Sequence, residues 1–219
     1  MIYPVRTVIY LGLDTCTRWL NLALTADGEE VLAQVHEQVP THTTRLVPAL
    51  DDLFIRAGRP KGDLAAIGVV LGPGSFTGLR VGLAAAEGLA AALRIPAYGL
   101  DSLSALALCG EGSGEGMAVL DARRKQVYAR RFSKSGRQVL ALDAAADLDP
   151  TEPLRFAGSE WAIGDGVPLV CAWPASCLLQ PEIPNLAVPA AAHAREAYAS
   201  GQPGTALAPL YVRGPDVRK

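Results

Sequence analysis

A glycine-rich segment at residues 72–75, Gly-Pro-Gly-Ser, is the part of the sequence best suited to bind an anion. An apolar run that ends at Leu71 has the length of a buried strand, and an alanine-rich helical pattern follows the segment. A turn between a strand and a helix presents backbone N–H groups and the positive end of the helix dipole to a bound phosphate. The candidate phosphate contacts are therefore Gly72, Gly74, Ser75 and Thr77.

The same segment lacks the lysine of a P-loop, which reaches the outer phosphates of a bound nucleotide. No lysine lies between Gly72 and Gly88, and this argues against an ordinary P-loop NTPase. On spacing alone, a tight turn in which Ser75 or Thr77 caps the following helix fits equally well. Two interpretations therefore stay open, a loop that contacts a nucleotide and a structural turn.

Asp14 ends the first predicted strand, where the chain turns through residues 15–17. In nucleotide-binding folds that begin this way, an aspartate at this position often orients a metal-bound water near the phosphates. The alternative is an Asx-type turn, in which the carboxylate accepts hydrogen bonds from nearby backbone N–H groups. Without further context the sequence favours the turn.

Histidine and cysteine residues are too few and too scattered for hydrolytic or metal chemistry. The three histidines are His36, His42 and His193, and they form neither an H-x-x-x-H pair nor an H-E-x-x-H motif. The four cysteines form no C-x-x-C pair, and no serine lies in a G-x-S-x-G motif. We therefore expect no catalytic residue and no metal ligand set in this chain.

A basic segment in the second half of the chain is a candidate RNA contact. Arg123, Arg124, Arg130 and Arg131 lie on one predicted hairpin with Tyr128 between them. Cations interleaved with an aromatic side chain can bind an RNA backbone. The alternative is a charged edge hairpin that resists aggregation.

The elements that would position these residues begin with three antiparallel strands, and Asp27-Gly28 is typical of the turn between the last two. Two helical patterns follow, the first stopped by Gly58. Because Pro48 is tolerated only near a first turn, the regular part of the first helix is predicted to begin near Val47. The predicted strands span 7–13, 20–25, 31–39, 63–71 and 95–98, and the predicted helices span 47–57, 77–93 and 101–108.

The helix predicted at 77–93 has unusually little side-chain bulk, since glycine and alanine fill much of its surface. Gly82 and Gly88 each cost about 1 kcal/mol relative to alanine inside a helix. Close approach of another backbone is the expected compensation. The helix is therefore predicted to lie between other elements of the domain or against a partner.

The second half repeats the layout of the first, with a strand at 117–120 that ends in Asp121 and a hairpin of strands at 125–132 and 138–142. The glycine-rich stretch 110–116 is interpreted as a flexible loop beside a domain boundary. The repetition predicts two related halves, 1–109 and a smaller 110–219. A further strand is considered at 154–157, and the final helix, predicted at 189–200, is a candidate to return to the first half.

Composition restricts the compartment and the partners. Half of the 219 residues are apolar, and 20 basic residues nearly balance 22 acidic ones, so the total charge does not require nucleic acid or membrane as a partner. The first apolar run, Val8 to Leu13, is too short for a membrane span. We expect a reduced, cytoplasmic protein without a membrane anchor.

Four segments together carry a family resemblance: LGLDTCT at 11–17, GPGSFTGLRVG at 72–82, DARRKQVYAR at 121–130 and PLYVR at 209–213. With these the chain resembles the TsaB (YeaZ) family, the bacterial subunit needed to form N6-threonylcarbamoyladenosine at position 37 of tRNAs. The resemblance covers nearly the whole chain, and GPGSFTGLR is highly specific. The chain departs from the family in Val212, where leucine is usual, and in its short, proline-rich second half.

The resemblance implies an α/β fold of the two-lobed actin, Hsp70 and sugar-kinase type (ASKHA), with a reduced second lobe. It also implies a degenerate paralogue of TsaD, which holds its metal with an H-x-x-x-H helix pair. In this chain His42 is followed four residues later by Leu46, so the second ligand is absent. The resemblance therefore implies vestigial nucleotide-site residues, no cofactor requirement of this chain, and ATP and a metal bound by partner subunits.

As a member of this family, the chain would bind TsaD as a heterodimer through the helices at about 46–57 and 77–93. TsaE would join the assembly, tRNA would be reached through the complex, and a homodimer would form when the partner is absent. The alternative is an active ATP-dependent transferase or metallopeptidase-like enzyme, which would use Asp14, Asp121 and the 72–75 loop. The expected interface residues are Leu46, Leu50, Leu53, Phe54, Gly82, Ala85, Ala86 and Leu89.

Overall fold

The computed structural model describes residues 8–27 and 30–213, and it divides the chain into two compact units. The first unit runs through Leu71 and also contains Ser75–Leu100 and Asn185–Pro209. Of the described residues, the second contains Gly72–Gly74, Asp101–Pro184 and 210–213. The boundary between the units therefore falls after Leu100, nine residues before the boundary expected from the sequence. The last helix belongs to the first unit.

The first unit is built on a five-stranded sheet in the order β3-β2-β1-β4-β5. The strands β1 (Ile9–Asp14), β2 (Trp19–Ala26) and β3 (Val31–Gln38) are antiparallel neighbours, as predicted. The strand β4 (Leu64–Val70) runs parallel to β1, and β5 (Ala97–Leu100) runs parallel to β4. The predicted turn at Asp27-Gly28 and the predicted strand start at residue 7 fall partly outside the described residues.

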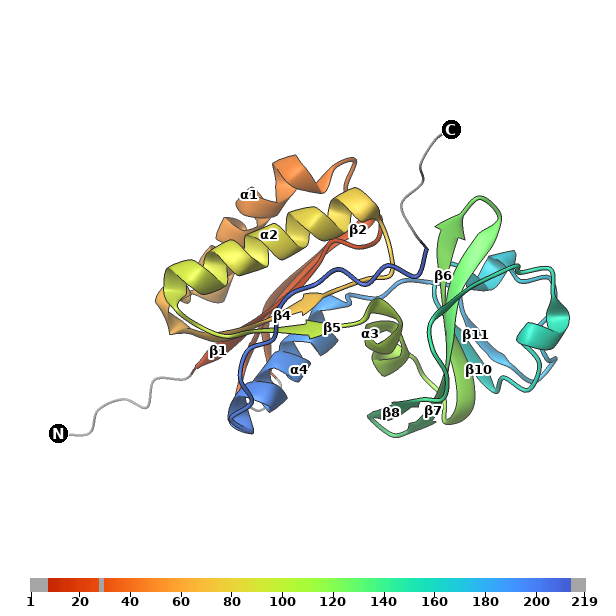
Figure 1. Cartoon of the computed structure of the whole chain (residues 1–219). Coiled ribbons are helices and arrows are strands. Elements are labelled where there is room, and N and C mark those ends of the chain that lie inside the picture. The colour runs from red at the N-terminus through yellow and green to blue at the C-terminus, as the bar shows by residue number, and fades with distance from the viewer. Residues whose placement is uncertain (1–7, 28–29, 214–219) are drawn as a thin grey trace. The chain divides into compact units, whose positions relative to one another are not determined.

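Helices cover both faces of this sheet (Figure 1). The helices α1 (His42–Ala57) and α2 (Phe76–Leu93) lie on one face, and α4 (Ala187–Ala199) lies on the other. A side chain at Gly12 or Gly68 would overlap backbone carbonyls of α4, so glycine in β1 and β4 is what lets this helix pack so closely. Burial on both sides explains why every residue of β1 and β4 is buried.

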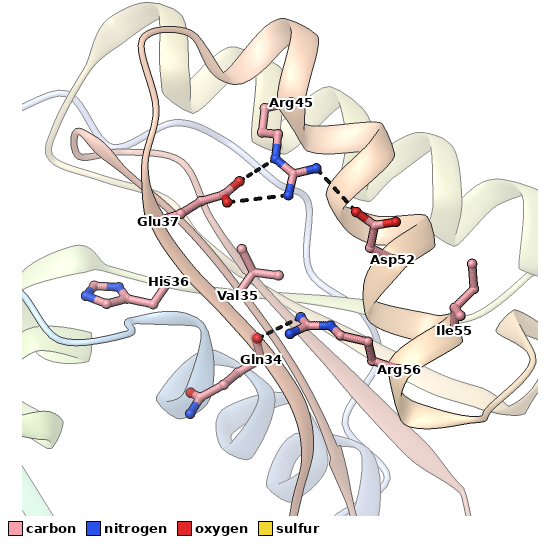
Figure 2. Close-up of a pocket in the computed structure, with 8 residues that line it drawn as sticks. All are labelled: Gln34, Val35, His36, Glu37, Arg45, Asp52, Ile55 and Arg56. Atoms are coloured by element: carbon pink, nitrogen blue, oxygen red, sulfur yellow. Dashed lines mark hydrogen bonds and ion pairs between the residues drawn. The ribbon is translucent and has the colours of Figure 1, made fainter.

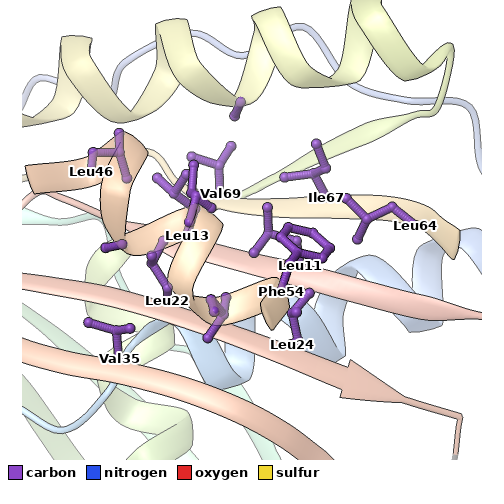
Figure 3. Packing of buried hydrophobic residues seen from close by; sticks show 14 of the residues in the cluster. Leu11, Leu13, Leu22, Leu24, Val35, Leu46, Phe54, Leu64, Ile67 and Val69 are labelled. Carbon is purple, nitrogen blue, oxygen red and sulfur yellow. The ribbon is translucent and has the colours of Figure 1, made fainter. Parts of the chain in front are cut away.

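The main core of the first unit fills the space between the sheet and α1 and α2 (Figure 3). Leu11 and Leu13 of β1 and Leu22 and Leu24 of β2 follow the two-residue period of a strand, which places them on one face. Phe54 and other apolar residues of α1 pack against this face. Each such side chain contributes about 1.5–3 kcal/mol by burial.

The predicted start of the first helix near Val47 is wrong, because α1 begins at His42 and contains Pro48 in its interior. Pro48 is exposed, whereas Leu46 and Ala49 on either side of it are fully buried. Tertiary packing of the flanking residues thus outweighs the local cost of the proline. The predicted stop is confirmed, since Gly58 has a left-handed φ of 62° and donates its N–H to Ile55 O and Phe54 O.

The second unit contains a six-stranded sheet in the order β11-β10-β6-β7-β8, with β9 paired to β7. The strands β6 (Gly114–Arg123) and β7 (Gln126–Ser135) form its longest hairpin, and β8 (Gln138–Ala141) and β9 (Ala146–Leu148) run antiparallel to β7. The short strands β10 (Trp161–Ile163) and β11 (Leu178–Gln180) extend the other edge in parallel. The helix α3 (Ser102–Cys109) packs on this sheet.

Two sequence interpretations of the second unit are wrong. The stretch 110–116 was expected to be a loop, but β6 already begins at Gly114, and a Cβ at Gly116 would overlap the ring of Trp161. Glycine here marks close packing rather than flexibility. The strand considered at 154–157 is absent, because the segment forms the 3-10 turn η2 (Pro153–Arg155), whose first residue is proline. Similar short turns are η1 (Lys61–Asp63) and η3 (Val167–Leu169).

Candidate partner-binding face and nucleotide-site residues

Asp14 is fully buried, and its carboxylate is occupied by donors of the chain itself. Its Oδ1 accepts from Cys16 N at 2.8 Å and from Cys16 Sγ at 2.7 Å, and its Oδ2 accepts from Asn21 Nδ2 at 2.7 Å. Burial raises the pKa of Asp14, and the hydrogen bonds from Cys16 and Asn21 oppose this shift. The bond from Cys16 N is that of an Asx-type turn, the alternative that the sequence favoured.

The hydrogen bonds of Asp14 continue across the sheet to His36. Asn21 Oδ1 lies 2.6 Å from His36 Nδ1, and the His36 ring stacks on Trp19 with centroids 4.3 Å apart. Sequence reasoning missed this network, because Asn21 faces Asp14 and His36 only through the register of β1, β2 and β3. Cross-strand pairing is the signal that would have found it.

The turn at residues 72–75 is closed by backbone contacts. Ser75 caps α2, because its Oγ accepts from Gly78 N at 3.2 Å, and Ser75 N donates to Cys16 O at 2.6 Å. Ser102 N donates to Gly72 O at 2.8 Å, and Ser102 Oγ donates to Pro73 O at 2.7 Å. These contacts fit the second of the two interpretations of this segment, a structural turn in which Ser75 caps the following helix.

The nucleotide-site candidates are divided between the units. Asp14, Ser75 and Thr77 belong to the first unit, and Gly72 and Gly74 group with the second. Among the described residues, no group of three or more histidine, cysteine, aspartate or glutamate side chains is placed to hold a metal ion.

Most of the interface residues expected on α1 and α2 point into the core of their own unit. Leu46 is 1% exposed, Leu53 is 0% and Ala86 is 0%. Leu50, Phe54 and Gly82 are also buried, so these six predictions are corrected. The apolar stripe that defines a helix in the sequence is the one that packs on the sheet. Ala85 and Leu89 are partly buried at its margin.

The outward face of α1 and α2 carries a different set of apolar and small residues. On α1, Val47 is 60% exposed and Ile55 is 77% exposed. On α2, Phe76 is 42% exposed, and Gly88 has open space where a Cβ would lie. Large apolar side chains off the core stripe of α1 are the sequence signal that would have identified this face.

The helix α2 is unusually apolar for a helix that is mostly exposed in its own unit. By length and mean hydropathy (1.3 over 18 residues) it is the one described helix apolar enough to cross a membrane, yet only 28% of those residues are buried. Ala84, Gly88 and Ala91 are exposed along it. Small outward residues allow another backbone to approach closely, as in tightly packed helix pairs.

A charged groove of about 550 Å³ lies between the edge strand β3 and α1 (Figure 2). Arg45 bridges two carboxylates, with Nε 2.5 Å from Glu37 Oε1 and Nη1 3.4 Å from Asp52 Oδ2. Arg56 Nη2 donates to the backbone carbonyl of Gln34 at 2.8 Å and covers part of the strand edge. The charged side chains of the groove therefore join the edge strand β3 to α1.

Two of the four arginines considered as an RNA contact make hydrogen bonds within the second unit. Arg130 donates to Asp143 O at 2.8 Å, and Arg131 Nη2 donates to Ala157 O at 2.7 Å. These two residues thus hold neighbouring segments of the second unit in place. Arg123 and Arg124 lie at the exposed tip of the hairpin.

Comparison with known proteins identifies the family. The TsaD family model (tRNA N6-adenosine threonylcarbamoyltransferase) matches residues 31–158. The chain is 31% identical over 172 residues to the tRNA threonylcarbamoyladenosine biosynthesis protein TsaB of Escherichia coli, covering 75% of this chain and 73% of that protein. The chain belongs to the TsaB (YeaZ) family. The predicted resemblance is confirmed.

Two further matches cover the chain more completely. YeaZ from Pseudomonas aeruginosa has a TM-score of 0.79 and 27% identity, with 93% of this chain and 99% of that chain covered. An uncharacterized protein of Mycobacterium tuberculosis is 35% identical over 218 residues, 98% of this chain and 96% of that protein. The predicted α/β class of the fold is thereby confirmed.

Proposed function

We propose that this chain is a non-catalytic subunit in the formation of threonylcarbamoyladenosine on tRNA. It binds TsaD through the outward face of α1 and α2, and TsaE joins the assembly. The curated TsaB relatives are named for this biosynthesis, which supports the pathway. The observation that carries the partner role is the combination of exposed Val47, Ile55 and Phe76 with the small residues of α2.

The chemistry of the chain supports an accessory role. Leu46 stands where a second histidine would complete a helical metal pair, and it is buried in the core. Both carboxylate oxygens of Asp14 accept hydrogen bonds from donors in its own chain. ATP and the metal are therefore assigned to the partner subunits, and the cytoplasmic location expected from the sequence belongs to the same proposal. A homodimer through the same face is proposed for the isolated chain.

Gly88 offers a sharp test of the proposed face. Its Cβ position is open, so Gly88→Arg places a long charged side chain outward without disturbing the core. Replacing a helical glycine also removes its propensity cost of about 1 kcal/mol, so the variant should be at least as stable as the wild type. Co-elution with TsaD on size-exclusion chromatography should be lost.

Gly88→Ala is the matched control, because it removes the same glycine and keeps the surface small. It should co-elute with TsaD like the wild type. An unchanged complex with Gly88→Arg would show that TsaD binds elsewhere. Ala86→Arg is unsuitable for this test, since Ala86 is fully buried and the variant would fail to fold.

The competing hypothesis, an active ATP-dependent enzyme, is tested on the isolated chain. Such an enzyme should bind ATP with Mg²⁺ at micromolar affinity, whereas an accessory subunit should show no heat of binding in titration calorimetry.

A further inference from the structure

The tip of the β6–β7 hairpin carries three cations in succession. Arg123, Arg124 and Lys125 are all exposed, and Arg123 has a side chain that is 73% accessible. The hairpin is the longest of the second unit, and its tip extends past the neighbouring strands of that unit (Figure 1). The position is suited to contact with another molecule.

All three residues have left-handed backbone conformations. Their φ angles are 62°, 53° and 61°, and the only other described non-glycine residue with positive φ is Arg94. Arg124 and Lys125 are the central pair of a two-residue hairpin loop, where positive φ at both positions strongly favours Asn-Gly. Arginine and lysine are unfavourable at positions where φ is positive. Backbone strain of this kind is concentrated at functional sites.

The conformation is held from within the unit. The Asp121 carboxylate accepts from Arg123 N at 2.7 Å and from Arg123 Nη1 at 3.3 Å. Asp121 N in turn donates to Asp165 Oδ1 at 2.9 Å. Since Arg123 is largely exposed, its ion pair with Asp121 is weak and exchangeable. The two aspartates therefore hold the backbone of the turn, on which all three cationic residues are exposed.

We propose that this tip, residues 123–125, is a docking point for the phosphate backbone of tRNA. This rests on the proposed function, which supplies tRNA as the substrate of the assembly. Arginine and lysine side chains on a projecting turn suit phosphate oxygens. A contact to phosphate positions the RNA without reading its base sequence. Arg130 and Arg131 contribute to the hairpin's stability and not to this contact.

The test neutralises the tip in the complex assembled with TsaD and TsaE. The variant Arg123→Gln/Arg124→Gln/Lys125→Gln should weaken tRNA binding on the order of tenfold and reduce the slope of log Kd against log salt by about 2–3. The control Arg18→Gln/Arg137→Gln/Arg155→Gln removes the same charge from scattered exposed positions. It should leave the slope almost unchanged.

A second variant separates a structural role from a binding role. Arg124→Asn/Lys125→Gly supplies the preferred turn residues, so the melting temperature should rise by about 2–4 °C while tRNA binding weakens. A raised melting temperature with unchanged tRNA binding would overturn the proposal. So would an equal salt slope for the neutralised tip and the wild type.

The outcomes also separate this proposal from the proposed function. If the neutralised tip keeps TsaD but binds tRNA as the wild type does, only the docking proposal fails. If the neutralised tip loses TsaD or TsaE instead, the tip is a protein contact and the RNA assignment is wrong. If the wild type itself forms no complex with TsaD, the proposed function fails.

Discussion

At the scale of single residues, Asp14 is the most informative side chain of the first unit. It ends β1 where a nucleotide-site carboxylate was considered, yet it is fully buried, and Cys16 and Asn21 occupy both of its oxygens. Its carboxylate accepts the hydrogen bond that closes the turn at residues 14–16. A buried acid of this kind should appear in the pH dependence of stability.

Burial raises the folded-state pKa of Asp14 above the unfolded value, which is about 3.9. As pH rises, Asp14 therefore stays protonated to a higher pH in the folded state than in the unfolded state. Protonated Asp14 therefore contributes to the free energy of unfolding. This contribution is fully present below the unfolded-state pKa and is lost as pH rises through the raised folded-state pKa. Asp14→Asn removes this titration.

We therefore expect the unfolding free energy of the wild type, minus that of Asp14→Asn, to fall as pH increases from about 4. Urea denaturation of both proteins between pH 4 and 7 measures this difference. A difference that stays constant, or that rises with pH, would contradict the raised pKa.

At the scale of elements, the sequence predicted which segments are strands and helices better than it predicted their faces. The three opening strands and α2 lie where periodicity placed them. The faces of α1 and α2 were misassigned, because a hydrophobic stripe looks the same whether it packs on its own sheet or on a partner. Leu53 and Ala86 show the outcome, since both are fully buried in the unit's own core.

A glycine-rich stretch caused one further error, because the role of a glycine depends on the groups that pack against it. Gly116 was interpreted as part of a flexible loop, but it makes room for Trp161 within β6. Gly12 and Gly68 make room for α4, which is distant in sequence. Such long-range packing leaves no local signature, so one sequence could not reveal it.

The packing of α4 gives a prediction at this scale. Gly12→Ala places a Cβ on the backbone carbonyl of Ala187, which cannot move without displacing the helix, so it should destabilise the protein by about 1–3 kcal/mol. Gly62→Ala is the control, since nothing lies within 4 Å of its Cβ position, and it should stay within about 0.5 kcal/mol of the wild type. Thermal and urea denaturation report both values. Equal stability of the two variants would mean that α4 does not pack as described.

At the scale of the whole molecule, the chain has the fold of the TsaB family. Asp14 and Ser75, which the sequence offered as nucleotide contacts, make hydrogen bonds within the chain. Family membership could be predicted from four short motifs, because these motifs are specific. The proposed partner face was not predicted, because the prediction placed it on the core stripe of α1 and α2 and not on the apolar residues outside that stripe. In this account the chain takes part in tRNA modification by binding other proteins through α1 and α2.

Reconstitution of the modification reaction tests this account most directly. TsaD, TsaE and the enzyme that makes the threonylcarbamoyl donor are incubated with tRNA, with and without this chain, and threonylcarbamoyladenosine is quantified after nuclease digestion. The account predicts that the modified nucleoside forms only when the chain is present. Full activity in its absence would contradict the account.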